Sequence, residues 1–119
     1  MFDFLRKDVV LDTDDAGLRR LTHERLKVFT KFTADNCPVC EMLGPSFARF
    51  ADDEAYEGIL FLRLDADQSP VARQLMNERA APFFVSYCQG RVVECDTRHT
   101  EADVEAQLAR LRALMPHTA

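Results

Sequence analysis

The sequence predicts an α/β fold in which a mixed central sheet of about five strands is flanked by about four helices. Strand-like and helix-like segments alternate through most of the chain, which favours parallel strands joined by right-handed crossovers. Two further strand-like segments then follow one another closely, as in an antiparallel hairpin, before a last helix. With 47% apolar and 29% charged residues, the 119 residues suit a single domain, 1–119.

The first elements lead up to a pair of cysteines. Val9–Leu11 is a short strand candidate, and we expect Asp12 and Thr13 to cap a helix that runs to about Leu21. Leu26–Phe32, with the sequence LKVFTKF, alternates and is rich in β-branched and aromatic residues, which predicts a strand. The motif CPVC follows this strand directly.

The middle of the chain predicts two helices separated by a buried strand. From Pro38 to about Ala51 apolar residues recur at helical spacing, with Pro45 expected to kink the helix. Ile59–Leu64 is a continuous apolar run with one charge, as expected of a strand buried on both faces. Ser69 followed by Pro70 indicates the start of the next helix.

The last part of the chain predicts a hairpin and a helix. Pro82 is expected to stop the preceding helix, and Phe83–Tyr87 and Arg91–Cys95 form a hairpin with Gly90 in the turn. Thr100 is expected to cap the last helix, with an acidic residue three positions later. The apolar face of this helix is expected to consist of Val104, Leu108, Leu111 and Met115.

Two of the four cysteines, Cys37 and Cys40, form a CxxC motif where a strand meets a helix. This junction favours a redox pair over a structural disulfide framework. Disulfide exchange needs a thiolate that attacks a substrate disulfide and a nearby thiol that resolves the mixed disulfide. Cys37 lies at the helix N-terminus, where unpaired N–H groups and the helix dipole stabilise a thiolate, so we expect it to be the nucleophile. Cys40, one turn further on, is expected to be more buried and to resolve the mixed disulfide.

Two other interpretations of the pair stay open, namely inert buried thiols and half of a zinc site completed by Cys88, Cys95 or His99. We expect Cys88 near the hairpin turn, at the far end of the sheet, so that four ligands would not meet. Cys88 and Cys95 are then ordinary free cysteines, and no metal or cofactor is expected. Within the motif, Pro38 suits the first helical position and Val39 gives the site an apolar rim.

Four pieces of the chain resemble the thioredoxin family and together cover nearly its whole length. VFTKFTADNCPVCEMLGP is similar to the central strand and redox loop of that family, and LRLDADQSP to its next strand and turn. AAPFFVSYCQGRVV is similar to the segment with the cis-proline and terminal hairpin, and the residues from Thr100 onward to the closing helix. The resemblance implies the thioredoxin fold and thiol-disulfide oxidoreductase activity, with a redox disulfide between Cys37 and Cys40.

The resemblance also implies residues of a substrate groove. It implies a cis peptide bond between Ala81 and Pro82 that faces the cysteines and leaves the Ala81 backbone free to pair with an extended substrate. Arg98 stands where the family usually has a glycine beside this groove, and His99 follows it. There Arg98 either attracts an acidic substrate or simply faces solvent.

Asn36, Lys31 and the CPVC motif depart from the family pattern in ways that touch the chemistry. Asn36 precedes CPVC where the family has a tryptophan, and the chain contains no tryptophan. Lys31 stands at the strand position usually held by a buried aspartate. Either its ammonium lies near the cysteines, favours the thiolate and makes the disulfide a stronger oxidant, or it extends into water and leaves the thiols unaffected. CPVC itself is closer to the CPYC of glutaredoxins.

The charge and hydropathy of the sequence limit the kinds of partner that the chain can bind. The formal net charge of -5, with both signs interspersed, gives no basic stripe for a nucleic-acid backbone. No signal peptide is expected, and no apolar stretch approaches the roughly 18 to 20 residues that span a bilayer. We expect a cytoplasmic monomer that acts on disulfides of protein substrates and draws electrons from a reductase or glutathione. The alternatives are a glutaredoxin-like, glutathione-dependent reductase and a non-catalytic module that binds a protein partner.

Overall fold

Five strands form one mixed sheet in the computed structural model, which describes residues 10–116. The strand order is β1-β3-β2-β4-β5. Neighbours among β1, β3 and β2 are parallel, whereas β4 is antiparallel to both β2 and β5. This is the expected mixed sheet, although Val9 of the first predicted strand lies outside the described residues. The strands are β1 Val10–Asp12, β2 Lys27–Thr33, β3 Ile59–Asp65, β4 Phe83–Cys88 and β5 Arg91–Thr97.

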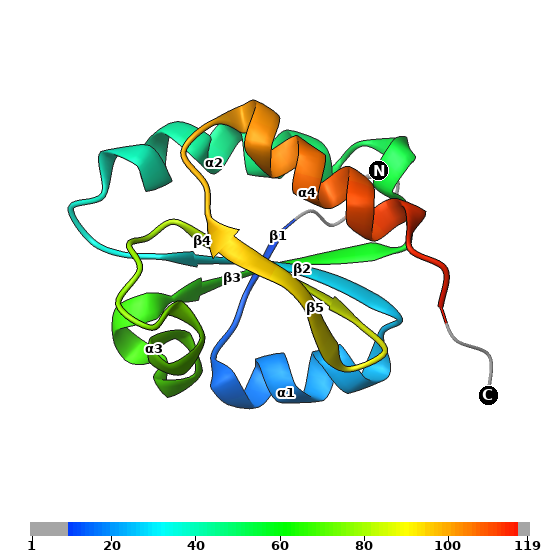
Figure 1. The fold of residues 1–119 in the computed structure, drawn as a ribbon, viewed down its shortest axis with the longest axis horizontal. Coiled ribbons are helices and arrows are strands. Elements are labelled where there is room, and N and C mark those ends of the chain that lie inside the picture. Colours follow the sequence, from blue (N-terminus) through cyan, green and yellow to red (C-terminus); the bar gives the residue numbers. More distant parts are fainter. Residues whose placement is uncertain (1–9, 117–119) are drawn as a thin grey trace, which may run out of the picture.

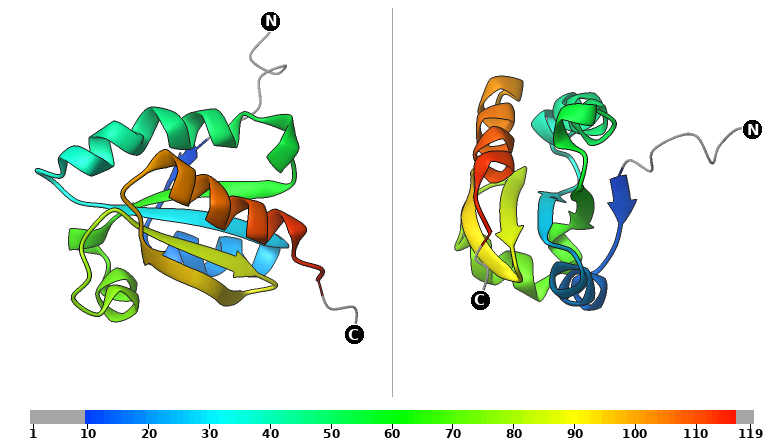
Figure 2. Two further views of the ribbon diagram at one scale, coloured as in Figure 1. Left: turned by 45° about the horizontal axis from the view of Figure 1, so that its top comes forward. Right: turned by 90° about the vertical axis from the view of Figure 1, so that its right-hand side faces the viewer.

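Four α-helices of the described chain cover the two faces of the sheet. Helices α2 and α4 lie on one face, and α1 and α3 lie on the other (Figure 1). Figure 2 shows the same three layers from two further directions. No helix within residues 10–116 has both the length and the apolar character needed to cross a membrane. The helices are α1 Asp15–Glu24, α2 Pro38–Ala51, α3 Pro70–Met76 and α4 Glu101–Ala113, with short 3-10 turns at Glu54–Tyr56 and Ala66–Gln68.

The sheet separates two hydrophobic clusters, because successive side chains of a strand point to opposite faces. On β2, Val28 and Phe32 belong to the cluster under α1 and α3, and Phe29 belongs to the cluster under α2 and α4. The second cluster is largely aromatic, with ring centroids 5.3 to 6.0 Å apart. Burial of a phenylalanine side chain contributes about 2 to 3 kcal/mol. This cluster therefore fixes α2, and with it the CxxC motif, on the sheet. The four rings in mutual contact belong to Phe29, Phe47, Phe61 and Phe84, and the rings of Phe50 and Tyr56 form a further pair in the same cluster.

The predicted starts of the last two helices are confirmed, but the two predicted caps of the first helix are wrong. The hydroxyl of Ser69 caps α3, and that of Thr100 caps α4. Helix α1 is capped by Asp14, and it runs to Glu24 rather than Leu21. Asp12, one of the two expected caps, instead belongs to β1, where its carboxylate pairs with Arg63 of the neighbouring strand. The other expected cap, Thr13, lies before Asp14 and outside the helix.

Two helix ends also differ from the prediction. Helix α3 ends at Met76, and Asn77 after it has a φ of 48°, a left-handed conformation that ends helices. The helix therefore stops well before Pro82. Helix α4 buries Val104, Leu108 and Leu111 as expected, but it ends at Ala113. Met115 lies beyond that end and is 83% exposed, so it is not part of the core face.

The predicted hairpin is confirmed, and α2 continues through Pro45. Both Gln89 and Gly90 adopt positive φ angles in the hairpin turn, at 54° and 81°. Gly90 therefore shares the turn with its neighbour rather than supplying it alone.

Candidate active site

The CxxC motif lies at the carboxyl end of β2, where the chain turns into α2. Asn36 makes this turn with a φ of 55°, which asparagine tolerates better than most residues. Cys37 is the N-cap of α2, and Pro38 occupies the first turn, where its missing N–H removes no helical hydrogen bond. The local sequence therefore presents Cys37 at the exposed start of a helix.

A disulfide joins Cys37 to Cys40, with the two Cα atoms 5.2 Å apart. The spacing of three residues over one helical turn brings both sulfurs to the same side of the first turn. Cys37 is half-buried, whereas Cys40 is only 6% exposed. This difference in exposure is the one predicted for a nucleophile and a resolving thiol.

The Cys37 sulfur lies in a polar environment that favours a thiolate. The backbone N–H of Cys40 points at it, with a nitrogen–sulfur distance of 3.1 Å. The positive end of the α2 dipole lies at the same place. Once the disulfide is reduced, both effects stabilise negative charge on this sulfur.

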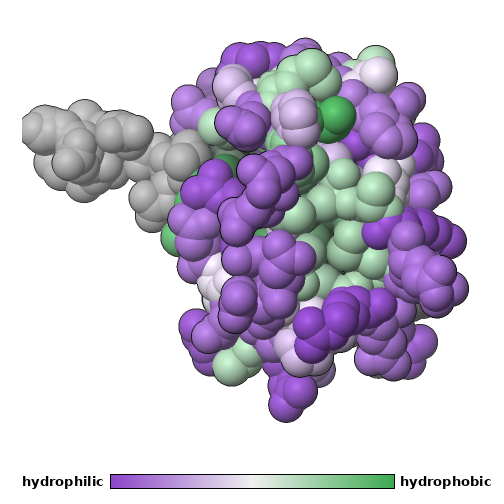
Figure 3. Space-filling view, turned by 90° about the vertical axis from the view of Figure 1, so that its left-hand side faces the viewer, coloured by the Kyte–Doolittle hydropathy of each residue, from purple (hydrophilic) through white to green (hydrophobic). Residues whose placement is uncertain are grey.

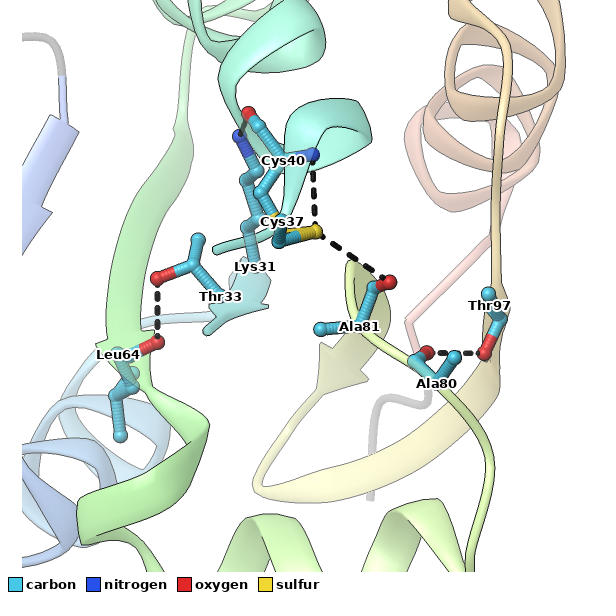
Figure 4. The surroundings of a disulfide bond; sticks show 8 residues. All are labelled: Lys31, Thr33, Cys37, Cys40, Leu64, Ala80, Ala81 and Thr97. Atoms are coloured by element: carbon cyan, nitrogen blue, oxygen red, sulfur yellow. Dashed lines mark hydrogen bonds between the residues drawn. A yellow bond between two sulfur atoms is a disulfide. The ribbon is translucent and has the colours of Figure 1, made fainter. Parts of the chain in front are cut away.

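The peptide bond between Ala81 and Pro82 is cis, as the resemblance implies. The carbonyl oxygen of Ala81 lies 3.6 Å from the Cys37 sulfur, and Pro82 is buried (Figure 4). The hydroxyl of Thr97 donates to the Ala80 oxygen at 2.6 Å, which ties this loop to β5. The loop and the first turn of α2 therefore form the two sides of the site.

Lys31 extends from β2 toward the underside of the first turn of α2 (Figure 4). It is 2% exposed, and its Nζ donates to the Cys40 carbonyl oxygen at 2.9 Å. The ammonium also lies 5.7 Å from the centre of the Phe47 ring. Burial, with a smaller contribution from the positive charge of Arg63, lowers the pKa of Lys31 to about 8. The alternative that Lys31 extends into water is therefore wrong.

Arg98 lies near the site through its backbone only. Its N–H donates to the Pro82 oxygen at 3.2 Å. Its guanidinium donates to Gln107 and Glu94, each at 2.9 Å, because the packing of α4 against β5 brings these two acceptors within reach. The guanidinium is 18% exposed, so the alternative that it simply faces solvent is wrong, and its role beside the substrate groove stays a prediction. His99 is exposed on the loop between β5 and α4.

Apolar side chains are accessible on the first turns of α2, the helix that begins after Cys37. Val39 is half-buried on the first turn of α2, and Met42 is 58% exposed one turn further on. The end of the molecule at which α2 begins carries an apolar area ringed by hydrophilic residues (Figure 3). Such an area suits contact with another protein chain.

The sequence analysis missed two polar side chains that shape the site. Thr97 fixes the loop before the cis bond from 17 residues away, and no local motif pairs it with Ala80. Gln107 is completely buried on α4, and its amide donates to Phe84, Ser86 and Glu94. A glutamine within an otherwise apolar helix face was the available signal for the second residue.

The other two cysteines do not join the pair. Cys88 is buried at the end of β4 that pairs with Lys27, far along β2 from the CxxC motif. Cys95 is half-buried and stands opposite Val85, so both cysteines are free, as predicted. No cluster of three or more histidine, cysteine or acidic side chains that suits a metal occurs within residues 10–116.

Known proteins of one family match this sequence. The family model described as Thioredoxin matches residues 9–110. Thioredoxin of Malassezia sympodialis is 31% identical over 67 residues, which cover 56% of this chain and 64% of that relative. Thioredoxin H5 of Arabidopsis thaliana is 30% identical over 63 residues, which cover 53% of this chain and 52% of the relative. The chain thus spans less than two thirds of the length of these curated relatives.

Solved structures share the fold over a greater length. The Malassezia sympodialis thioredoxin superposes with a TM-score of 0.78 at 23% identity, over 89% of this chain and 96% of that one. A mutant thioredoxin from Halobacterium salinarum gives a TM-score of 0.77 at 22% identity, over 93% and 97% of the two chains. The chain therefore has the same fold as these proteins.

Proposed function

Because the chain belongs to the thioredoxin family, we propose that it is a thiol-disulfide oxidoreductase that reduces or exchanges disulfides in other proteins. One observation carries this proposal: a disulfide joins the accessible Cys37 to the buried Cys40. Two inert thiols would need neither access to the first sulfur nor a backbone donor directed at it. Cys37 is the nucleophile, and Cys40 is the resolving thiol.

The reaction takes place in two exchanges of a sulfur–sulfur bond. In the reduced protein, the Cys37 thiolate attacks one sulfur of a substrate disulfide, and the other substrate sulfur leaves and takes a proton from water. Cys40 then loses its proton and attacks the Cys37 sulfur, which releases the second substrate thiolate. Two electrons pass to the substrate, and the Cys37–Cys40 disulfide remains. An external dithiol or a reductase must return these electrons.

The substrate binds as an extended segment between the first turn of α2 and the loop that contains Ala81. The apolar Val39 and Met42 on one side, and the Ala81 carbonyl beside the Cys37 sulfur on the other, support this placement. Backbone groups beside the cis bond would pair with the substrate main chain, so recognition would depend little on substrate sequence.

We place this activity in the cytoplasm of the cell, in a monomer that binds neither nucleic acid nor membrane. The free thiols of Cys88 and Cys95 are typical of a reducing compartment. The net charge of -5 disfavours contact with phosphate backbones and anionic lipids. Both cysteines of the pair come from one chain, so the chemistry needs no second copy.

A turbidity assay of insulin reduction would test the proposal. Thioredoxin reductase with NADPH supplies electrons in one arm, and glutathione with glutathione reductase supplies them in the other. The proposal expects turnover in at least one arm, complete loss in Cys37→Ser, and full activity in the control variant Cys95→Ser. The arm that supports turnover identifies the electron donor. If the folded protein shows no turnover in either arm, the proposal is wrong.

A further inference from the structure

Lys31 is a buried cation that has no role in the reaction proposed above. Its side chain is 2% exposed on the central strand β2. Lysine is almost never buried to this degree unless it is paired, because removal of a charge from water is costly. The neighbouring lysine on the same face of the strand, Lys27, shows the usual arrangement with an exposed ammonium.

The ammonium of Lys31 lies against the helical turn that carries both sulfurs. Its Nζ is 2.9 Å from the Cys40 carbonyl oxygen. Only a few covalent bonds separate this oxygen from the sulfur of the same residue, so the ammonium lies within roughly 8 Å of the Cys40 sulfur. At that separation in a protein interior, a positive charge lowers the pKa of a thiol by about one pH unit.

Among the described residues, no acidic side chain lies close enough to Lys31 to form an ion pair with it. The carboxylates on the adjoining elements, Glu41 of α2 and Asp65 of β3, are exposed. On β3 the register partner of Lys31 is another cation, Arg63, and on β4 it is the apolar Phe84. Within the part of the chain that the structure describes, the titratable group left to balance the ammonium is the Cys40 thiol on the turn above it.

We propose that Lys31 is a positioning residue for the proposed reaction, and that its ammonium is the counter-ion of the Cys40 thiolate. When Cys37 is held in a mixed disulfide, the Cys40 thiol releases its proton to water, and the resulting thiolate faces the ammonium. Its attack forms the Cys37–Cys40 bond and breaks the bond to the substrate. No separate base is then needed close to Cys40.

The same charge affects the balance between the two redox states. A cation that stabilises a thiolate stabilises the reduced pair, in which the thiolate exists, and has no such effect on the disulfide. The disulfide of this protein is therefore a stronger oxidant than the same pair without the cation. Because the coupling is reciprocal, formation of the thiolate also raises the proton affinity of Lys31.

Titration of Cys40 alone tests the proposal without turnover. In a Cys37→Ser background, thiolate ultraviolet absorbance is followed against pH, and the signal of the Cys37→Ser/Cys40→Ser protein is subtracted to remove the other thiols. We expect Lys31→Met to raise the pKa of Cys40 by about one pH unit. Lys31→Gln, which keeps a hydrogen-bond donor for the Cys40 carbonyl but no charge, should raise it equally.

Lys27→Met is the matched control, since it removes an ammonium that also donates to helix-end carbonyls, those of Arg112 and Leu114, on the same strand. It should leave the Cys40 titration unchanged. An unchanged Cys40 pKa in both Lys31 variants would overturn the proposal. A rise in the methionine variant alone would overturn it too, because the hydrogen bond and not the charge would then be responsible. These readouts stay valid even if insulin is not a substrate.

The rate of the resolving step gives a second test. In a Cys95→Ser background, the reduced protein reacts with a dithiobis-nitrobenzoate reagent. Stopped-flow absorbance then records one coloured nitrothiobenzoate when Cys37 attacks the reagent, and a second when Cys40 attacks the resulting mixed disulfide. The loss of thiolate, partly offset by its higher intrinsic reactivity, predicts a second phase about threefold to tenfold slower in Lys31→Met at neutral pH. The first phase should change less. Equal second phases in the two proteins would contradict the assigned role.

Discussion

Replacement of Lys31 by methionine should stabilise the oxidised protein at neutral pH, because it removes a buried charge and keeps a side chain of similar length. The fall of the Lys31 pKa from 10.5 to about 8 means that burial of the charged ammonium destabilises the folded protein by at most about 3 to 4 kcal/mol. Screening by solvent reduces this destabilisation. The hydrogen bond from Lys31 to the Cys40 carbonyl and the contact of its ammonium with the Phe47 ring offset about 1 kcal/mol more of it. We therefore expect Lys31→Met to be about 1 to 2 kcal/mol more stable.

This advantage should disappear as the pH rises. Below about pH 8 the folded and unfolded chains both hold the Lys31 proton, so the full cost of the buried charge is present. Between about pH 8 and 10.5 the folded protein has released this proton and the unfolded chain still holds it, so the stability of the unmutated protein rises. Above that window Lys31 is neutral in both states.

Guanidinium chloride denaturation, followed by circular dichroism at several pH values across this window, would measure the effect. The difference between the two proteins cancels the titration of other groups, including Tyr87, whose pKa is raised by burial. Lys27→Met serves as the control and should show no difference that varies with pH in this way. If the stability curves of Lys31→Met and the unmutated protein stay parallel, the buried lysine does not titrate as described and the reasoning is refuted.

Two further predictions concern packing and reactivity. Gln107→Leu should lower the free energy of unfolding by about 1 to 3 kcal/mol, because it removes one of the two acceptors of the Arg98 guanidinium and the amide that donates to the Phe84 carbonyl and the Ser86 hydroxyl. Denaturant midpoints would measure the loss, and an unchanged midpoint would contradict it. In the reduced protein, limiting iodoacetamide should alkylate Cys37 before any other cysteine, as read by peptide mass mapping. Earlier alkylation of Cys95 would count against Cys37 as the accessible nucleophile.

The elements that sequence analysis predicted well are those decided by local chemistry. The alternation in LKVFTKF placed β2, and serine and threonine caps placed the starts of α3 and α4. The CxxC motif was located because a strand leads directly into a helix that starts with Pro38. Each of these signals is complete within a few residues.

The predictions that were wrong or left open concern residues whose positions depend on contacts between distant segments. Asp12 was a reasonable cap until the pairing of β1 with β3 placed it opposite Arg63. The alternation of β2 put Lys31 on the face of Phe29, which indicates burial, while its charge indicated solvent. The packing of α2 over the sheet decides between burial and exposure, because it covers Lys31 and provides the Cys40 carbonyl as an acceptor. Arg98 was assigned to the groove because it stands where the family usually has a glycine, and its hydrogen bond to Gln107 of α4 could not be recognised from spacing.

The central claim is that Cys37 attacks substrate disulfides and Cys40 resolves the product, and trapping of mixed disulfides tests it most directly. Reduced Cys40→Ser and Cys37→Ser proteins, with Cys95→Ser in both, would be incubated with a disulfide-containing protein such as insulin and examined by non-reducing electrophoresis and mass spectrometry. Cys40→Ser should accumulate a covalent adduct through Cys37 that dithiothreitol removes, and Cys37→Ser should accumulate none. Equal adducts in both variants, or none in either although both are folded, would contradict the account.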